Sequence, residues 1–383
     1  MGKILILGID GYIGWPLAIH LSLRGYEVIG VDNLNRRKWV ERLGSQSVLP
    51  ILSPFERLRK FYLKYHKNIT FFFGSVTDYQ FLRDIFHMVK PDVIVHLAEQ
   101  PSAPYSMKGQ KECIETYTNN VIGTLNVIWA IKEMCPDAHL VKLGTMGVYS
   151  YELPIDVPEG DLEVEYKGKK VKLPYPKLGA SWYHRSKSCD SINLEFASQL
   201  YGLTVTDCHQ GIVYGTRIDE MEDDIFFTRY DVDEAFGTVI NRFVAQAVVG
   251  IPLTLYGKGH QKRGFLPLRD SIQCLRLLIE NPPKKGEYRV VNQIENHYDL
   301  TEIAEKVVKV GKKFGLKVKI QKLPNPRAEK DEHYYNPTHK ILLELGYKPS
   351  SQMEKELELM FKDVIIYKAR IKKEVILPKI KWK

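Results

Sequence analysis

The beginning of the chain carries the feature that most limits its possible folds. Residues 3–8 form a short apolar run, KILILG, that leads directly into the spacing Gly8-x-x-Gly11-x-x-Gly14. Helical spacing follows, and a second apolar run occupies residues 27–32. A strand, a glycine turn, a helix and a second strand within about 30 residues are typical of a β–α–β crossover. The chain is therefore expected to open a parallel sheet covered by helices.

The same alternation continues to about residue 215 and then loosens. Stretches suited to strands and helices alternate at residues 69–74, 79–89, 92–98, 120–134, 139–145, 180–200 and 203–215. This pattern predicts an α/β fold, a doubly wound parallel sheet of the Rossmann type. We expect residues 1–215 to form this domain, with an insertion at about 35–68. Residues 216–383 are expected to form a smaller substrate-binding domain, some segments of which return to the first.

Charge and cysteine content argue against several classes of protein. The formal net charge is +9, and basic residues gather at Arg36–Lys38 and in the tail from Lys368 to Lys383. No nucleic-acid-binding motif accompanies this charge, which suits a phosphate-bearing substrate better. The five cysteines include no CxxC pair, so neither a metal site nor a disulfide framework is expected. No apolar run has membrane-helix length and the start does not resemble a signal peptide, so we expect a cytoplasmic protein without membrane or nucleic-acid partners.

The glycine loop and the end of the second apolar run together indicate a dinucleotide site. The first glycine permits a tight turn, the second lets backbone approach a pyrophosphate, and the third allows close helix–strand packing. The helix N-terminus then faces the anion. Asp32 ends the second strand, where a carboxylate binds the adenosine ribose and repels a 2′-phosphate, which favours NAD over NADP. Arg36 and Arg37 leave NADP open, since they could hold either that phosphate or the pyrophosphate.

Tyr183 and Lys187 form a YxxxK pair within YHRSK. Residues four apart share one face of a helix. An ammonium near the phenol favours the phenolate, a base that can take a proton from an alcohol as hydride leaves. Thr145, at the end of an earlier predicted strand, would hydrogen-bond the same substrate oxygen. His184 adjoins the tyrosine and is a candidate for proton transfer.

These residues together resemble the extended, or atypical, short-chain dehydrogenases that modify nucleotide sugars. Within that group the chain resembles the enzymes that join sulfite to UDP-glucose. The similar stretches lie between residues 8 and 336 and read GIDGYIGW, VDNLNRR, SAPYS, NNVIGTLNV, AIKE, HLVKLGTMG, LPYPK, YHRSK, QGIVYG, FGTVINRF, LTLYGKG, NPR and EHYYN. The resemblance implies bound NAD, UDP-glucose and sulfite as substrates, and a sulfonated UDP-sugar product used for sulfolipid or sulfoglycan. It also implies a homodimer or larger homo-oligomer that pairs through long helices, including the helix of Tyr183.

The resemblance also assigns individual residues. It implies catalytic roles for Thr145, Tyr183, Lys187 and His184. It implies NAD contacts from Gly8, Gly11, Tyr12, Ile13, Gly14, Asp32, Asn33, Arg36, Arg37, Ser75, Val76, Leu97, Asn120, Tyr183, Lys187, Gln210 and Val213. It implies nucleotide-sugar contacts from Thr145, Tyr183, Gln210, Asn241, Tyr256, Arg263, Arg327 and Glu329. Arg263 and Arg327 suit a diphosphate by charge and by fork geometry.

The residues after Thr145 separate the chain from its relatives. Sugar 4,6-dehydratases place an Asp-Glu pair there, whereas this chain has Met146 and Gly147, so an internal dehydration that reduces C6 lacks its acid and base. Pro101 and Val148 stand where the sulfite-using enzymes usually have arginine and glutamate. A UDP-glucose 4-epimerase, another NAD-dependent nucleotide-sugar dehydratase and a non-catalytic NAD-sensing protein therefore stay open as alternatives.

Overall fold

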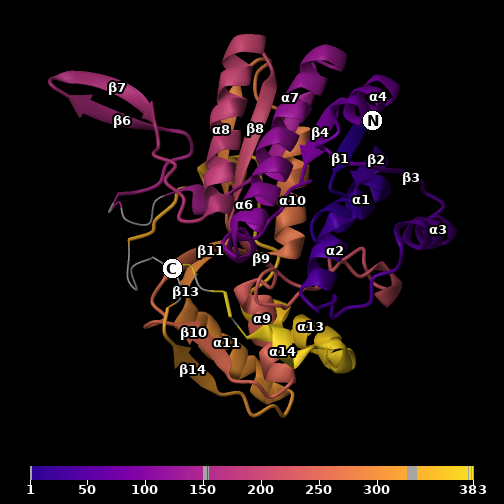
Figure 1. Ribbon diagram of the computed structural model, residues 1–383, viewed down its shortest axis with the longest axis vertical. Helices are drawn as coiled ribbons and strands as arrows, with labels where there is room; N and C mark the ends of the chain where they lie inside the picture. The colour runs from indigo at the N-terminus through magenta and orange to yellow at the C-terminus, as the bar shows by residue number, and fades with distance from the viewer. Residues whose placement is uncertain are drawn as a thin grey trace.

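The computed structural model describes residues 2–149, 153, 155–325, 334–377, 379–380 and 382. Within these residues a parallel seven-stranded sheet forms the upper part of the molecule in Figure 1. Its strands, in order across the sheet, are β12 (Tyr288–Gln293), β8 (Thr204–Gln210), β5 (His139–Thr145), β4 (Val93–His96), β1 (Lys3–Leu7), β2 (Glu27–Asp32) and β3 (Ile69–Phe73). The chain order reverses between β1 and β4, as it does in a doubly wound sheet, so the predicted fold class is confirmed.

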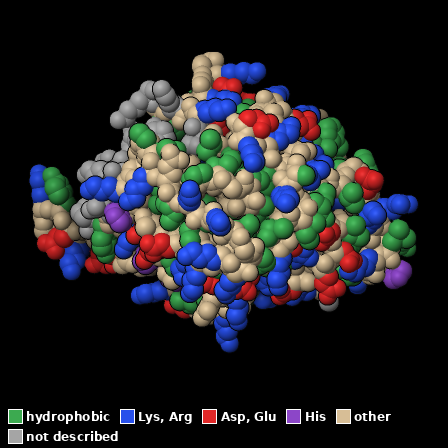
Figure 2. Space-filling model, turned by 90° about the horizontal axis from the view of Figure 1, so that it is seen from below, with side chains coloured by type: hydrophobic (Ala, Val, Ile, Leu, Met, Phe, Trp, Pro, Cys, Tyr) green, Lys and Arg blue, Asp and Glu red, His purple; other side chains and the backbone are tan. Residues whose placement is uncertain are grey.

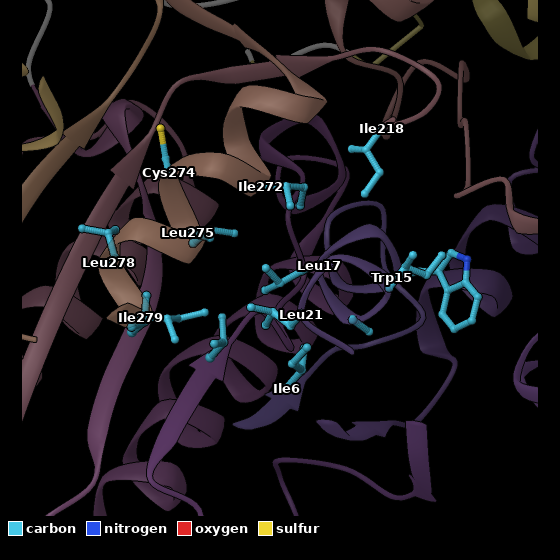
Figure 3. Close-up of a cluster of buried hydrophobic side chains, with 14 of the residues drawn as sticks. Ile6, Trp15, Leu17, Leu21, Ile218, Ile272, Cys274, Leu275, Leu278 and Ile279 are labelled. Carbon is cyan, nitrogen blue, oxygen red and sulfur yellow. The ribbon is translucent and has the colours of Figure 1, made fainter. Parts of the chain in front are cut away.

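Helices cover both faces of this sheet. They are α1 (Gly14–Leu23) and α10 (Leu268–Glu280) on one face, and α4 (Tyr79–Val89), α7 (Gly123–Met134) and α8 (Trp182–Tyr201) on the other. Ile6 packs into the hydrophobic core on the side of α1 and α10, and Figure 3 shows it below Leu17 and Leu21 of α1. Leu5 and Leu7 pack into the core on the side of α4, α7 and α8. Successive strand residues thus point to opposite faces of the sheet. Because both faces of the sheet are buried under helices, its strands are continuous apolar runs.

The second layer of the molecule lies at the carboxyl ends of these strands (Figure 1). It contains β9 (Ile212–Tyr214), β11 (Lys262–Pro267) and β13 (Asn296–Asp299), the pair β10 (Leu253–Tyr256) and β14 (Ile320–Leu323), and helices α9 (Val239–Val248), α11 (Leu300–Lys313), α13 (Met353–Ile366) and α14 (Lys373–Ile376). The predicted strand 203–215 is interrupted at Gly211, where a Cβ would lie 2.7 Å from the carbonyl oxygen of Gly264. The chain leaves the large sheet there, and α10 and β12 later return to it.

The expected insertion contains two helices, α2 (Asn35–Arg42) and α3 (Pro54–Tyr65). Ser53 and Glu56 form a capping box at the start of α3. Both helices are tied to the glycine loop through the carboxylate of Asp10. Arg37 donates two hydrogen bonds of 2.7 Å to it, and the buried Arg57 donates one of 3.1 Å. The insertion is therefore fixed directly against the loop that follows β1.

A hairpin of β6 (Asp161–Tyr166) and β7 (Lys169–Pro174) projects from the body of the molecule (Figure 1). Its register pairs Leu162 with Leu173 on one face and Glu163 with Lys172 on the other. Opposite charges across the strands stabilise such a pair modestly.

The remaining elements are short. They are α5 (Ala103–Ser106), α6 (Gln110–Tyr117), η1 (Thr118–Ile122), η2 (Met146–Val148), η3 (Asp224–Phe226), α12 (Lys340–Glu344) and η4 (Lys368–Arg370). On the face seen in Figure 2, Lys and Arg side chains are interspersed with acidic and hydrophobic ones. Across the described ranges, no helix combines the length and apolarity needed to cross a membrane.

Candidate active site

A cavity of about 400 Å³ lies at the carboxyl ends of the central strands. Gly8 and Leu97, which follow β1 and β4, form its wall at the point where the strand order reverses. Thr145 and Gln210, which end β5 and β8, continue the wall toward the second layer. Open α/β sheets bind their ligands at this position.

Most of the predicted site residues meet in this cavity. Those that line it are Gly8, Gly11, Tyr12, Ile13, Gly14, Asp32, Asn33, Arg36, Val76, Leu97, Thr145, Tyr183, His184, Lys187, Gln210, Val213, Asn241 and Arg263. Arg37, Ser75, Asn120 and Tyr256 lie outside the lining. Arg327 and Glu329 are outside the described residues.

Three of the residues outside the lining make hydrogen bonds or ion pairs in the segments around the cavity. Arg37 is engaged by Asp10 in the glycine loop. Ser75 accepts a hydrogen bond of 3.1 Å from the side chain of Asn33. Asn120 is fully buried and accepts a 2.8 Å bond from the backbone N–H of Gln100. Their predicted direct contacts with NAD stay predictions.

The glycine loop has a shape that only glycine can provide. Gly8 has φ of +93°, and a Cβ there would lie 2.7 Å from the carbonyl carbon of Leu97. A Cβ at Gly14 would lie 2.2 Å from the carbonyl oxygen of Gly8. The loop therefore leaves room for a ligand to approach bare backbone at the start of α1, which fits the pyrophosphate of NAD.

Asp32 ends β2 and lies beside this loop. Its carboxylate accepts hydrogen bonds from the backbone N–H groups of Asp10, at 2.9 Å, and Leu34, at 2.7 Å. Burial raises its pKa to about 6, and the neighbouring Asp10 acts in the same direction. At neutral pH the group is thus mainly ionised and lines the cavity as an acceptor, which fits the adenosine ribose of NAD.

Tyr183 lies in the first turn of α8, whose N-terminus is capped by Ser181. The phenol is buried and hydrogen-bonded to Thr145. Burial raises the pKa of Tyr183 to about 12, while the ammonium of Lys142 and the Thr145 hydrogen bond both act to lower it. The phenol of Tyr183 is therefore protonated at neutral pH and needs nearby positive charge to act as a base.

The ammonium of Lys187 lies differently from the sequence-based expectation. It forms an ion pair with Glu99 and donates a 2.5 Å hydrogen bond to the carbonyl oxygen of Leu143. Burial lowers its pKa to about 8, opposed by Asp190 and Asp207. A buried carboxylate attracts the ammonium more strongly than a neutral phenol does, which explains its place.

Sequence reasoning missed two residues here, Glu99 and Lys142. Lys142 is fully buried; it forms ion pairs with Glu99 and, at 2.9 Å, with Asp190. Glu99 also lines the cavity and thereby joins Lys142 to Lys187. The sequence feature that could have indicated them is Lys142 itself, a lysine inside the apolar run 139–145, because a charge in a central parallel strand requires a buried partner.

The ring of His184 occupies the space beside Gly147, which has no side chain. A Cβ at Gly147 would lie 2.3 Å from His184 Nε2, so only glycine at that position accommodates the ring. The other ring nitrogen, Nδ1, lies 3.0 Å from the hydroxyl oxygen of Ser181. The imidazole is thus held between Ser181 and Gly147, in the wall of the cavity.

The opposite part of the cavity is formed by the second layer together with the end of β8. Arg263 on β11 supplies a guanidinium, and Gln210 supplies a buried side-chain oxygen without a hydrogen-bond partner within the described part of the chain. Asn241 on α9 accepts from the backbone N–H of Gly215 at 3.3 Å. These groups fit a polar, anionic ligand such as a diphosphate sugar. In the ranges that the structure describes, no three His, Cys, Asp or Glu side chains group to hold a metal ion.

Comparison with known proteins shows one consistent likeness. A model of the NAD dependent epimerase/dehydratase family matches residues 4–292. UDP-sulfoquinovose synthase of Sulfolobus acidocaldarius is 48% identical over 384 residues, covering 100% of this chain and 98% of that protein. Chloroplastic UDP-sulfoquinovose synthase of Spinacia oleracea is 44% identical, covering 100% and 79%. UDP-glucose 4-epimerase of Thermotoga maritima, solved with UDP-glucose, matches with a TM-score of 0.69, covering 96% and 99%; at 20% identity it shows the fold alone.

Proposed function

The chain belongs to the NAD-dependent epimerase/dehydratase family, and from this premise we propose that it is a UDP-sulfoquinovose synthase, which converts UDP-glucose and sulfite to UDP-sulfoquinovose and water. The observation that carries the proposal is the full-length identity of 48% and 44% to two proteins of that name. A UDP-glucuronate 4-epimerase, a UDP-glucuronic acid decarboxylase and a dTDP-glucose 4,6-dehydratase are far more distant from this chain, at 24%, 26% and 23% identity.

The cavity supports the first step of such a reaction. NAD, held by the glycine loop and Asp32, would supply the hydride chemistry by accepting hydride from C4 of the sugar and returning it at the end. Tyr183 accepts the proton of the C4 hydroxyl as that carbon becomes a ketone. Thr145, already hydrogen-bonded to the phenol, holds the same oxygen. The Lys142 ammonium favours the phenolate that this step requires.

The ketone makes the later steps possible. It acidifies the hydrogen on C5, so loss of that proton and of the C6 hydroxyl as water leaves a conjugated enone. Sulfite adds through sulfur to C6, a carbon–sulfur bond forms, and a proton returns to C5. Reduction of C4 then restores the hydroxyl, and no net oxidant is consumed. His184 is the proposed proton carrier at C5 or C6, because Gly147, which stands where the resemblance gives the dehydratases an acidic residue, leaves room for the imidazole in the cavity wall.

The proposal is tested by giving the purified protein UDP-glucose with and without sulfite and analysing the nucleotide sugars by mass spectrometry. A sulfonated UDP-sugar that forms only with sulfite supports the synthase, and Tyr183→Phe should lower its rate by at least about 100-fold. UDP-galactose formed regardless of sulfite would identify an epimerase instead. NAD binding without turnover of any UDP-sugar would identify an NAD sensor.

The proposal includes a homodimer that pairs through α7 and α8. Ile192, Phe196 and Leu200 lie four residues apart on α8 and are 59%, 59% and 55% exposed, so they form an apolar stripe that the described part of the chain leaves open. On α7, Trp129 is 40% exposed and its ring lies 5.6 Å from that of Tyr201. Such a continuous face on two neighbouring helices suits a second copy of the chain.

A further inference from the structure

Trp382, near the end of the described chain, lies at the cavity. Trp382 is part of the cavity wall, as are Trp39 of α2 and Phe236. Ile380 packs against the hydrophobic cluster that Trp39 and Phe236 form with Val40, Tyr105 and Ala235. These residues lie far apart in the sequence, so the tail crosses back from the second layer to reach the cavity.

Two attachments hold this segment in place. Ile376 of α14 is fully buried in the hydrophobic core of the second layer. Further on, the carboxylate of Glu234 accepts hydrogen bonds from the backbone N–H groups of Lys379 and, at 3.1 Å, of Ile380. The backbone N–H of Glu234 in turn donates a 2.9 Å bond to Val375. Trp382 therefore follows a fixed stretch of chain.

Ile380, two residues before Trp382, packs against the part of the wall formed by Trp39 and Phe236, and Trp39 lies on α2, the helix that follows Asp32. Arg36, in the first turn of α2, stacks its guanidinium 3.8 Å above the ring of Phe236 and pairs with Asp231. Trp39, one turn later, stacks on the same ring at 6.3 Å between centroids. Arg263, by contrast, reaches the cavity from β11 in the second layer. Ile380 thus lies with the residues that follow the proposed ribose-binding carboxylate, and Trp382 reaches the cavity two residues later.

We infer that Trp382, positioned by Ile380 and Glu234, is part of the dinucleotide site and slows the dissociation of NAD. An indole offers a large rigid surface that stacks on a base or ribose at little entropic cost. Retention matters because the proposed reaction removes hydride and later returns it to the same sugar. A cofactor lost in its reduced form would leave a ketone that the enzyme could not reduce. The inference rests on NAD use and not on sulfite as the second substrate.

The experiment measures the release of NADH from the full chain in the absence of sugar and sulfite. Protein loaded with NADH is mixed with excess NAD, and the loss of bound-NADH fluorescence gives the dissociation rate. Trp382→Ala should release NADH at least tenfold faster than the unmodified protein, and Trp382→Phe should restore most of the retention. Glu234→Gln, which weakens the attachment, should give an intermediate rate. Tyr166→Ala, at the tip of the exposed hairpin, is the aromatic control and should leave the rate unchanged.

Melting temperatures of all variants without nucleotide separate a local effect from unfolding, and Trp382→Ala should melt within a degree or two of the unmodified protein. An unchanged NADH dissociation rate in Trp382→Ala overturns the inference. So does failure of the full chain to bind NADH. Because no sugar is present, neither result depends on whether the protein makes a sulfonated product.

Discussion

The proposed role of His184 depends on residue 147 being a glycine, which has no side chain. Its ring occupies the space that any Cβ at residue 147 would fill. We predict that His184→Asn still oxidises C4, seen as NADH absorbance on adding UDP-glucose, but forms sulfonated product about 100-fold more slowly. Gly147→Ala should show the same separation, because it displaces an intact imidazole. Equal loss of both steps would instead place His184 in the hydride step.

Lys142 sets the charge around Tyr183 without lining the cavity. Its ammonium lowers the pKa of a phenol that burial raises to about 12. Removing the charge in Lys142→Met should raise that pKa, so less phenolate is present at any given pH and the acid limb of the kcat/KM profile moves to higher pH. Lys142→Arg keeps the charge and should keep the limb near its original position. An unmoved limb in Lys142→Met would show that the lysine only supports the fold.

At the scale of elements, the helices α2 and α3 are predicted to depend on one buried carboxylate. Arg57 of α3 is 1% exposed; it donates to Asp10 and, at 2.8 Å, to the carbonyl oxygen of Phe227. Arg57→Met should lower the free energy of unfolding by about 3 kcal/mol, because it leaves buried acceptors unpaired. Arg59→Met, an exposed position on the same helix, should change it by less than about 0.5 kcal/mol in the same denaturant titration. Equal values for the two variants would contradict this account.

The elements also show how far local sequence patterns reach. The strand runs and the glycine loop were predictable because both faces of the sheet are buried and because Gly8 and Gly14 admit no Cβ. The end of β8 was not, since Gly211 breaks the strand only through its contact with Gly264, a residue of another element. The ion-pair partner of Arg37 was not predictable for the same reason: Asp10 lies in another element, the glycine loop.

At the scale of the whole molecule, the site brings together residues that lie far apart in the sequence. The meeting of Tyr183, Lys187 and Thr145 in one cavity was predictable, because the first two share the local YxxxK spacing on a helix and the third ends a strand. Glu99 and Trp382 were not, since only the folded chain brings them to the cavity. Residues beyond 215 contribute α10 and β12 to the large sheet, and the division into domains at that residue stays a prediction. A cytoplasmic location stays a prediction as well.

The apolar stripe on α8 gives a prediction for the assembly. Sedimentation velocity should show a dimer for the unmodified protein and a monomer for the double variant Ile192→Glu, Phe196→Glu, because two carboxylates cannot be buried unpaired in a symmetric interface. Phe55→Glu, on α3 and 71% exposed, should remain a dimer. A monomeric unmodified protein, or a dimeric double variant, would remove α8 from the interface.

The central claim is that the C6 hydroxyl leaves as water after C4 is oxidised and that sulfite takes its place. The most direct measurement is the reaction of UDP-glucose with sulfite in deuterium oxide, with the product analysed by mass spectrometry and NMR. The account predicts a UDP-sugar that carries a sulfonate on C6 and one deuterium on C5, with the C4 hydrogen retained from the substrate. A sulfonated product without deuterium at C5 would contradict the elimination route, and UDP-galactose alone would contradict the assigned reaction.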